Sequence, residues 1–495
     1  TVMGHNVASN LTTGGNNTAV GMDALLATVS HNNSTAIGYQ ALRANIAADN
    51  TAVGKDALAL NTTGSTNTAV GAAALDANTT AEYNTAIGAY ALSGATTGSY
   101  NTALGRGAGI AITTGTRNVA IGVDTLKAVT TGTNNTAIGT NAAGATTGDD
   151  NVAVGKAALN ANTTGDNNVA IGVNALALSV DVDNSVAIGY DAGANTVVAG
   201  IVAIGKDALK ANTTGSVQVA IGHSAAKSNT TGQRNLAIGY RAYEGSDTES
   251  DNVAIGYHAM VTNTAGGEQN VVVGNYAGDA ITSGDGNTAF GHLAGTVLNT
   301  GSSNTCIGYG SGSALTSGDN NVLIGLDAGA VSTGSNQLYI ARSSDNQGNN
   351  PVWIYGDGSG NVVQGNNATA WSQASDERIK KNIVDSSDGL AKINALQVRN
   401  FEYRTDAEIT VEGLTGINKA GVQVGAIAQE VEVVLPSAVH TGNGTQKQLK
   451  TDPIFWAMVK AIQELTTKIE VLEQEAGYHL DTIILDGTNG SSANA

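Results

Sequence analysis

The stretch NTAVGAAALDANTTAEY (Asn67–Tyr83) decides the fold, because the chain repeats it in varied form over its first two thirds. A second copy reads NVAVGKAALNANTTGDN (Asn151–Asn167), so the unit is about 17 residues long. The most regular position is the glycine that closes N-T/V-A-I/V-G, and its fixed periodicity indicates a solenoid. The twenty landmark glycines lie 16 to 18 residues apart, at Gly4, Gly21, Gly38, Gly54, Gly71, Gly88, Gly105, Gly122, Gly139, Gly155, Gly172, Gly189, Gly205, Gly222, Gly239, Gly256, Gly274, Gly291, Gly308 and Gly325.

Within each unit the letters predict two short strands and two turns. In TAIG, the first and third residues lie on one face of a strand and Ala lies on the other. A second apolar segment, xxAL, follows the glycine, and NTTG or TSGD then supplies residues that suit tight turns. A helix is disfavoured because Gly and β-branched residues recur every few positions. The first proline is Pro351, as expected where nearly every amide donates to a ladder.

The composition predicts a thin interior built from small residues. Only 4% of the 495 residues are aromatic and 64 are Gly, so side chains that fill thick cores are scarce. The single cysteine, Cys306, lies in the strand motif NTCIG, which favours a buried small hydrophobe over a reactive thiol. The seven histidines show no ligand spacing, and we expect neither a metal site nor a cofactor.

One coil of this length encloses little volume, so a single chain would leave an apolar strip exposed along the solenoid. Lateral association with identical chains would cover the strip, and we therefore expect a homo-oligomeric rod. If each coil advances by one strand spacing, twenty coils give a rod of roughly 95 Å.

The net charge of -18 makes nucleic acid and anionic membrane surfaces unfavourable partners. We expect no membrane insertion, since no apolar run in the sequence approaches the length of a spanning helix.

The NTAIGxxAL units resemble the β-roll head repeats of trimeric autotransporter adhesins and the fibre shafts of phage tails. From residue 375 the chain changes character, with the motifs SDERIKKNI, GLAKINALQVRNFEYR, VGAIAQEVEVVLPSAV and DPIFWAMVKAIQELTTKIEVLEQE in order. This part resembles the intramolecular chaperone of phage endosialidases and tail fibres, the peptidase S74 family. The resemblance implies a mostly β protein with four parts: a trimeric β-roll shaft (1–336), a β-rich neck (337–374), a small α+β chaperone domain ending in a coiled coil (375–477) and a tail (478–495).

In the S74 family the chaperone trimerises, aligns three fibre chains and cleaves itself off at the serine of its S-D-x-R-x-K motif. Carried over by position, the resemblance implies Ser375 as nucleophile, Lys380 as its base and cleavage between Ala374 and Ser375. Read from the letters alone, SDER is an ordinary helix start with Ser375 as the N-cap. If the cleavage implied by the resemblance takes place, each chain acts as an enzyme only once, on its own Ala374–Ser375 bond.

Near the C-terminus, Ile462, Leu465, Ile469 and Leu472 alternate by three and four residues, as in a short coiled-coil seam. The family implies three strands. A helix that packs only within its own chain is the alternative.

These features favour a structural fibre protein, a phage tail fibre located in the virion. Its expected partners are two further copies of itself, a host cell-surface receptor (glycan or protein), and a tail or baseplate protein bound through residues that precede Thr1. The alternative is an extracellular or cell-surface protein, such as a trimeric adhesin, with a permanent trimerisation cap. A glycan-cleaving enzyme is less favoured, because the repeats show no irregular insertion. Tyr39, Tyr240 and Tyr257 follow landmark glycines, and they form either an aromatic contact line for a receptor or packing contacts between coils.

Overall fold

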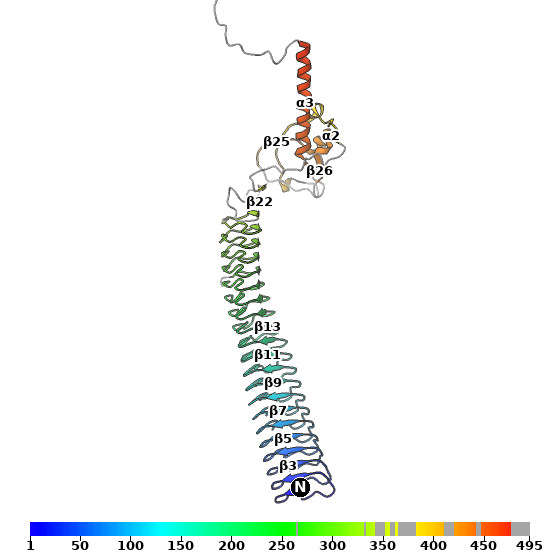
Figure 1. Cartoon of the computed structure of the whole chain (residues 1–495), viewed down its shortest axis with the longest axis vertical. Helices are drawn as coiled ribbons and strands as arrows, with labels where there is room; N and C mark the ends of the chain where they lie inside the picture. The colour runs from blue at the N-terminus through cyan, green and yellow to red at the C-terminus, as the bar shows by residue number, and fades with distance from the viewer. Residues whose placement is uncertain are drawn as a thin grey trace, which may run out of the picture. The chain divides into compact units, whose positions relative to one another are not determined.

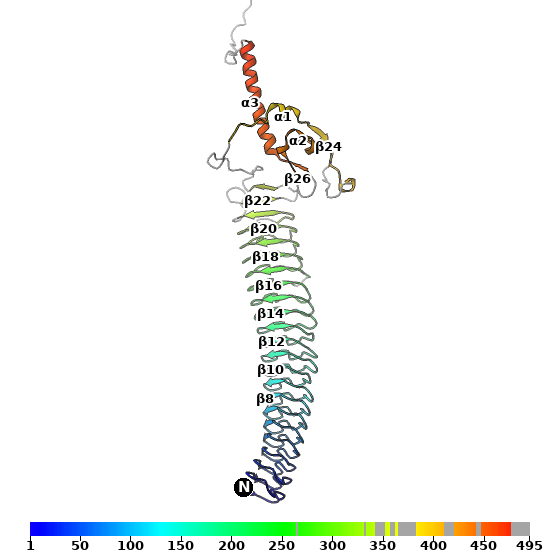
Figure 2. The ribbon, with the colours of Figure 1, turned by 90° about the vertical axis from the view of Figure 1, so that its right-hand side faces the viewer.

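The computed structural model describes residues 1–263, 266–330, 333–341, 352–356, 362–364, 383–409, 420–441 and 447–476. The chain divides into two compact units, Thr1–Ser372 and Gln373–Ala495. Unit 1 is a parallel β-solenoid in which coils stack one on another along its length (Figures 1 and 2). The mostly β fold with repeats of about 17 residues is thus confirmed.

Each coil contributes one short strand, and consecutive coils pair in parallel with the repeat in register. Ala52 lies opposite Ala69, for example, and Ala69 opposite Ala86. Strand therefore stacks on strand in sequence order, as a solenoid requires. The strands of the stack are β1 (Val2–Met3), β2 (Thr18–Val20), β3 (Thr35–Ile37), β4 (Thr51–Val53), β5 (Thr68–Val70), β6 (Thr85–Ile87), β7 (Thr102–Leu104), β8 (Val119–Ile121), β9 (Thr136–Ile138), β10 (Val152–Val154), β11 (Val169–Ile171), β12 (Val186–Ile188), β13 (Val202–Ile204), β14 (Val219–Ile221), β15 (Leu236–Ile238), β16 (Val253–Ile255), β17 (Val271–Val273), β18 (Thr288–Phe290), β19 (Thr305–Ile307) and β20 (Val322–Ile324).

The prediction of a second strand in each unit is wrong, because the segment after the landmark glycine forms turns. Two residues of this segment have left-handed backbone conformations, as at Asp56 (φ 58°) and Leu58 (φ 51°). The Leu58 side chain is fully buried, while its amide donates to the carbonyl of Ala74 in the next coil at 3.0 Å. The chain reverses direction within a few residues here and still keeps its coil-to-coil hydrogen bonds. We infer that these bonds and the buried Leu offset the cost of left-handed conformations.

The landmark glycine is required by close backbone approach. Gly88 has φ 140°, and a Cβ atom built on it would lie 2.4 Å from the carbonyl oxygen of Gly105. Such a contact is too short for any side chain, and the φ angle is one that other residues rarely adopt. The regular glycine in the sequence therefore marks where each strand ends against the next coil.

The core is as thin as the composition predicts. The middle residue of each strand is buried, as in Ala69 and Ala86, and a second buried residue four positions after the landmark glycine is often Leu, as in Leu75. Where that second position is Gly109, the buried Ile112 three residues later fills the space instead. Cys306 is fully buried, and burial raises the pKa of its thiol to about 12, so the prediction of a small buried hydrophobe is confirmed.

A buried asparagine ladder runs beside the strands, and it explains the first letter of the motif. The Oδ1 atom of Asn118 accepts the backbone amide of Asn135 at 3.0 Å, and its Nδ2 atom donates to the carbonyl of Gly132 at 2.8 Å. The same pattern recurs in many coils. Each such asparagine satisfies two buried backbone groups of the neighbouring coil, groups that would otherwise be costly to bury.

In the region predicted as a neck, the pairing becomes antiparallel. β21 (Leu338–Ala341) pairs in parallel with β20 and antiparallel with β22 (Val352–Gly356), which pairs with β23 (Val362–Gln364).

Unit 2 mixes short helices and hairpin-like strand pairs. It contains α1 (Leu390–Ala395), β24 (Arg399–Phe401), the 3₁₀ helix η2 (Asp406–Glu408), β25 (Gln423–Gly425), α2 (Ala428–Val434), the 3₁₀ helix η3 (Pro436–Ala438), β26 (Val439–Thr441), β27 (Lys447–Leu449) and the long α3 (Thr451–Ala476). β24 pairs with β25 and β26 with β27, both antiparallel. No helix among the described residues is long and apolar enough to cross a membrane.

Candidate functional site

The predicted cleavage residues Ala374, Ser375 and Lys380 lie outside the described residues, which resume at 383. Their roles stay predictions. The sequence also leads us to expect assembly with identical chains. The described part of unit 2 has exposed apolar side chains that bear on this expectation.

Unit 2 has a small core of its own. Val431, Leu435, Ala438 and Ala457 are buried together, so α2, η3 and the first half of α3 pack on one another. α1 also packs on α3, where the Glu464 carboxylate accepts the backbone amide of Leu390 at 2.9 Å. That contact satisfies one of the unpaired amides at the N-terminus of α1. The first half of α3 is therefore held by its own domain.

The second half of α3 carries an apolar stripe that its own unit leaves open. Ile462 is 62% exposed, Leu465 47%, Ile469 44% and Leu472 61%. These are the four residues of the predicted seam, and the structure confirms that they lie on one continuous helix. A stripe of this kind on a helix is stabilised only when another surface covers it. The packing of α3 within its own chain accounts for Ala457 and Ala461 but leaves this stripe uncovered.

Further apolar side chains of unit 2 are also exposed. Trp456 is 64% exposed, Val424 71% and Val433 84%. These exposed side chains come from α3, β25 and α2 respectively.

The solenoid has an open apolar strip as well, as the sequence predicts. In each strand the residues beside the buried Ala point outward, and Ile37 and Ile87 are each 40% exposed while Phe290 is 56% exposed. The strip continues over the strands β2 to β20, whose first residue is Thr, Val or Leu and whose third is Val, Ile, Leu or Phe. It offers a long, flat, β-branched surface for lateral contact between copies.

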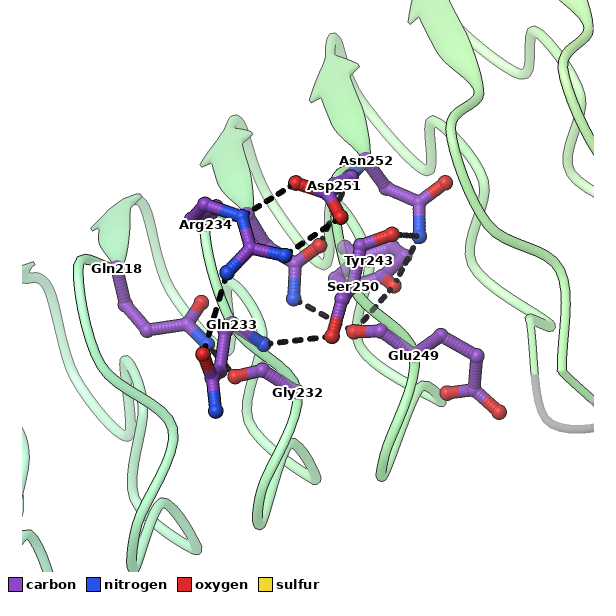
Figure 3. Close-up of polar contacts among 10 residues, drawn as sticks. Gln218, Gly232, Gln233, Arg234, Tyr243, Glu249, Ser250, Asp251 and Asn252 are labelled. Carbon is purple, nitrogen blue, oxygen red and sulfur yellow. Dashed lines mark hydrogen bonds and ion pairs between the residues drawn. The ribbon is translucent and has the colours of Figure 1, made fainter.

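One departure from the repeat is a buried carboxylate, Glu249, at a position where most other coils carry glycine (Figure 3). Ser246 Oγ donates to it at 2.7 Å, and the amides of Asp247, Thr248 and Gly266 donate at 3.0–3.1 Å. Burial alone would raise the pKa of Glu249, but these hydrogen bonds outweigh it and lower the pKa below the ordinary value. The sequence reasoning, which found no irregular unit, missed this residue.

The same coil carries a compensating tyrosine. Tyr243 occupies the buried leucine position, and its hydroxyl donates to the Glu249 carbonyl at 3.3 Å and accepts from Asn252 Nδ2 at 2.7 Å (Figure 3). On the surface of these coils, Arg234 makes a two-point contact with Asp251 at 2.6 and 2.8 Å. Because every carboxylate oxygen of Glu249 is engaged by its own chain, this cluster stabilises the coil and is not a reactive site. Aligning the units by column would have found it, since Tyr at 243, Ser at 246 and Glu at 249 all depart from the repeat in one coil.

Comparison with known proteins finds a match to a chaperone family within unit 2. Residues 375–440 match the family model of the chaperone of endosialidase, Peptidase S74, so the resemblance seen in the sequence is confirmed for this region. One similar protein is the "Probable tail fiber protein" of Escherichia phage Phieco32, which is 34% identical over 108 residues. That match covers 21% of this chain and 13% of the phage protein's length. No solved structure matches the chain significantly.

Proposed function

Because residues 375–440 match the chaperone-of-endosialidase family, we propose that this chain is a phage tail-fibre subunit whose C-terminal region directs assembly into a homotrimer. The observation that carries the proposal is the exposed stripe of α3, a helix that begins at Thr451, C-terminal to the family-matched segment. The apolar strip of the solenoid and the similarity to a tail-fibre protein support it.

An assembly device suits a shaft of this construction. Coils that are nearly identical specify register poorly, because three chains that slip by one coil still bury almost the same surface. Association of long β structures is also slow and leaves apolar strips exposed meanwhile. A C-terminal region that associates first fixes the register and raises the local concentration of the three shafts.

We further propose that the region then releases itself. The Ser375 hydroxyl attacks the carbonyl carbon of Ala374, and the Lys380 amine takes its proton. The peptide bond gives way to an ester, the new amino group of Ser375 is protonated, and water hydrolyses the ester to free the Ala374 carboxylate. Arg378 and Lys381 would favour a neutral Lys380 by charge repulsion. After release the template is gone, so unfolding of the trimer becomes hard to reverse.

The mature shaft would belong to the virion and serve attachment to a host cell surface. Its partners there would be a receptor, which is a glycan or a protein, and a tail or baseplate protein.

The test of release is the intact mass of the denatured chain from freshly assembled protein. We expect wild type to split between Ala374 and Ser375, and Ser375→Ala and Lys380→Ala to stay whole. Ser372→Ala is the matched control that changes the same residue type nearby, and it should split. Wild-type chains that remain whole in assembled fibres would contradict the release step.

A further inference from the structure

A row of stacked aromatic rings runs along one part of the solenoid. We call it the aromatic ladder, and it consists of His223, Tyr240, Tyr257, His258, Tyr276, His292 and Tyr309. Ring centroids of His223 and Tyr240 lie 5.3 Å apart, those of Tyr240 and Tyr257 5.2 Å, and those of His292 and Tyr309 5.1 Å. Tyr276 bridges the middle, 5.2 Å from Tyr257 and 6.3 Å from His292. Of the three tyrosines singled out in the sequence, the structure joins Tyr240 and Tyr257 with histidines and further tyrosines into one row over six coils, whereas Tyr39 lies in a distant coil beside Lys55.

The fold does not require aromatic residues at these positions. Five of the seven rings directly follow a landmark glycine, and elsewhere that position holds Ala72, Ala89 or Val123. The strands of those other coils pair in the same register. Coils with alanine at this position pair as well as coils with an aromatic residue. Coil pairing therefore does not explain why aromatic residues occupy the position in five coils of the ladder.

The rings are open to solvent. Tyr240 is 43% exposed, Tyr257 40%, Tyr276 37% and Tyr309 52%. Tyr240 stacks on Tyr257, whereas Tyr276 meets Tyr257 and His292 edge to face. The exposed row therefore offers parts of ring faces as well as edges, together with hydroxyl groups and imidazole nitrogens. Such a surface combines apolar contact with hydrogen-bond donors and acceptors. This combination is typical of sites where one side of the ligand contacts protein and the other side stays in contact with water.

The ladder carries little net charge at neutral pH. Arg241, beside it, is engaged by Glu244 in an ion pair. Burial, and then the nearby Arg241, lower the pKa of His258, so its imidazole is neutral. The chain as a whole is acidic, with a net charge of -18. The positive side chains next to the ladder, Arg241 and Lys206, each pair with a carboxylate, so the surface suits an uncharged, hydroxyl-rich ligand better than an anionic one.

We propose that the aromatic ladder binds a linear neutral polysaccharide that lies along the solenoid. One ring level per coil gives a periodic array, and a polymer of like sugar units repeats the same contacts at successive coils. Sugar hydroxyls would pair with the tyrosine hydroxyls and imidazole nitrogens, and sugar C–H groups would pack on the exposed parts of the ring faces, which carry the negative side of the ring quadrupole. Many weak contacts on one polymer sum to useful affinity. This inference rests on the proposed attachment role, because it names the chemical class of the host-surface receptor. It does not depend on the cleavage step.

The test uses the full chain in its assembled form on a printed array of linear neutral bacterial polysaccharides, together with dextran and pullulan. Dextran sulfate serves as the anionic comparison. The double variant Tyr240→Ala/Tyr257→Ala removes the centre of the ladder, and alanine at the equivalent positions 72 and 89 shows that the fold accepts it. The matched control is Tyr83→Ala/Tyr100→Ala, which removes another exposed stacked pair, 5.1 Å apart, outside the ladder.

We expect wild type and the control to bind at least one neutral polysaccharide, and the ladder variant to bind it about tenfold more weakly or not at all. The native mass of each variant is measured in parallel and should equal that of wild type. Absence of neutral-polysaccharide binding, equal loss in both variants, or binding of dextran sulfate alone would overturn the inference. If binding fails while the native mass stays that of a trimer, the ladder proposal is wrong and the assembly proposal stands.

Discussion

In most coils one buried asparagine bonds backbone groups of the next coil through its side chain, in addition to the backbone hydrogen bonds between coils. Asn135 and Asn134 allow a direct test, since they are neighbours with opposite surroundings. Asn135 is buried; its Oδ1 accepts the amide of Asn151 at 3.1 Å and its Nδ2 donates to the Gly148 carbonyl at 2.8 Å. Asn134 is exposed, and its Nδ2 donates to the Asp150 carboxylate at 3.0 Å on the surface.

We predict that Asn135→Ala lowers the free energy of unfolding by about 2–4 kcal/mol, because two buried backbone groups lose their partners. Asn134→Gly, which suits the left-handed backbone there (φ 59°), should cost less than about 1 kcal/mol. Urea denaturation followed by circular dichroism measures both. Equal losses in the two variants would show that the ladder does not carry the stability we assign to it.

The buried Glu249 predicts a pH dependence. Its pKa is lower in the folded chain than in the unfolded chain, so its carboxylate stabilises the fold above the ordinary pKa of a glutamate. That stabilisation is lost as the pH falls through the lowered value. The difference in unfolding free energy between wild type and Glu249→Gln should therefore be largest near pH 7 and shrink towards pH 3.

Urea denaturation at several pH values measures this difference. The exposed Glu268→Gln in the next coil is the control, and it should show a much smaller change. A Glu249→Gln difference that stays constant from pH 7 to pH 3 would rule out the assigned role of the carboxylate.

At the scale of elements, the sequence predicted the strand of each coil but not the segment after it. The alternation in TAIG fixes which residue points inward, and the burial of Ala69 agrees with it. The xxAL segment has the composition of a strand, and local propensity could not reveal its left-handed residues, such as Leu58, because they depend on contacts with the next coil. The asparagine ladder was missed for the same reason, since its partners lie a full coil away.

The helix α3 was predicted with its stripe, and the structure shows which half is free. We predict that Ile469→Asp weakens association of the chain at least tenfold, because it would bury several carboxylates at one seam. Thr467→Asp adds the same charge on the side of the helix away from the stripe and should have little effect. Analytical ultracentrifugation measures the association of each.

Circular dichroism should show the same helix content for both variants, since Ile469 is largely exposed in its own chain. Equal weakening in the two variants would mean that added charge, and not loss of the stripe, is responsible.

For the whole molecule, the sequence predicted a repeating solenoid and a resemblance of the C-terminal part to a chaperone family; the structure confirms the solenoid, and residues 375–440 match that family. Assembly depends on contacts between several copies of the chain. A single chain shows only which of its apolar surfaces are exposed. Those surfaces are the outer strip of the shaft and the stripe of α3. Both are apolar, and both are explained together if identical chains cover them.

The most direct test of this account is the native mass of the Ser375→Ala variant, in which release is blocked and every chain stays whole. The account predicts a single species with three times the 49.5-kDa chain mass. A folded protein that stays at one chain mass at micromolar concentration, with the strand signal of the shaft intact in circular dichroism, would contradict it.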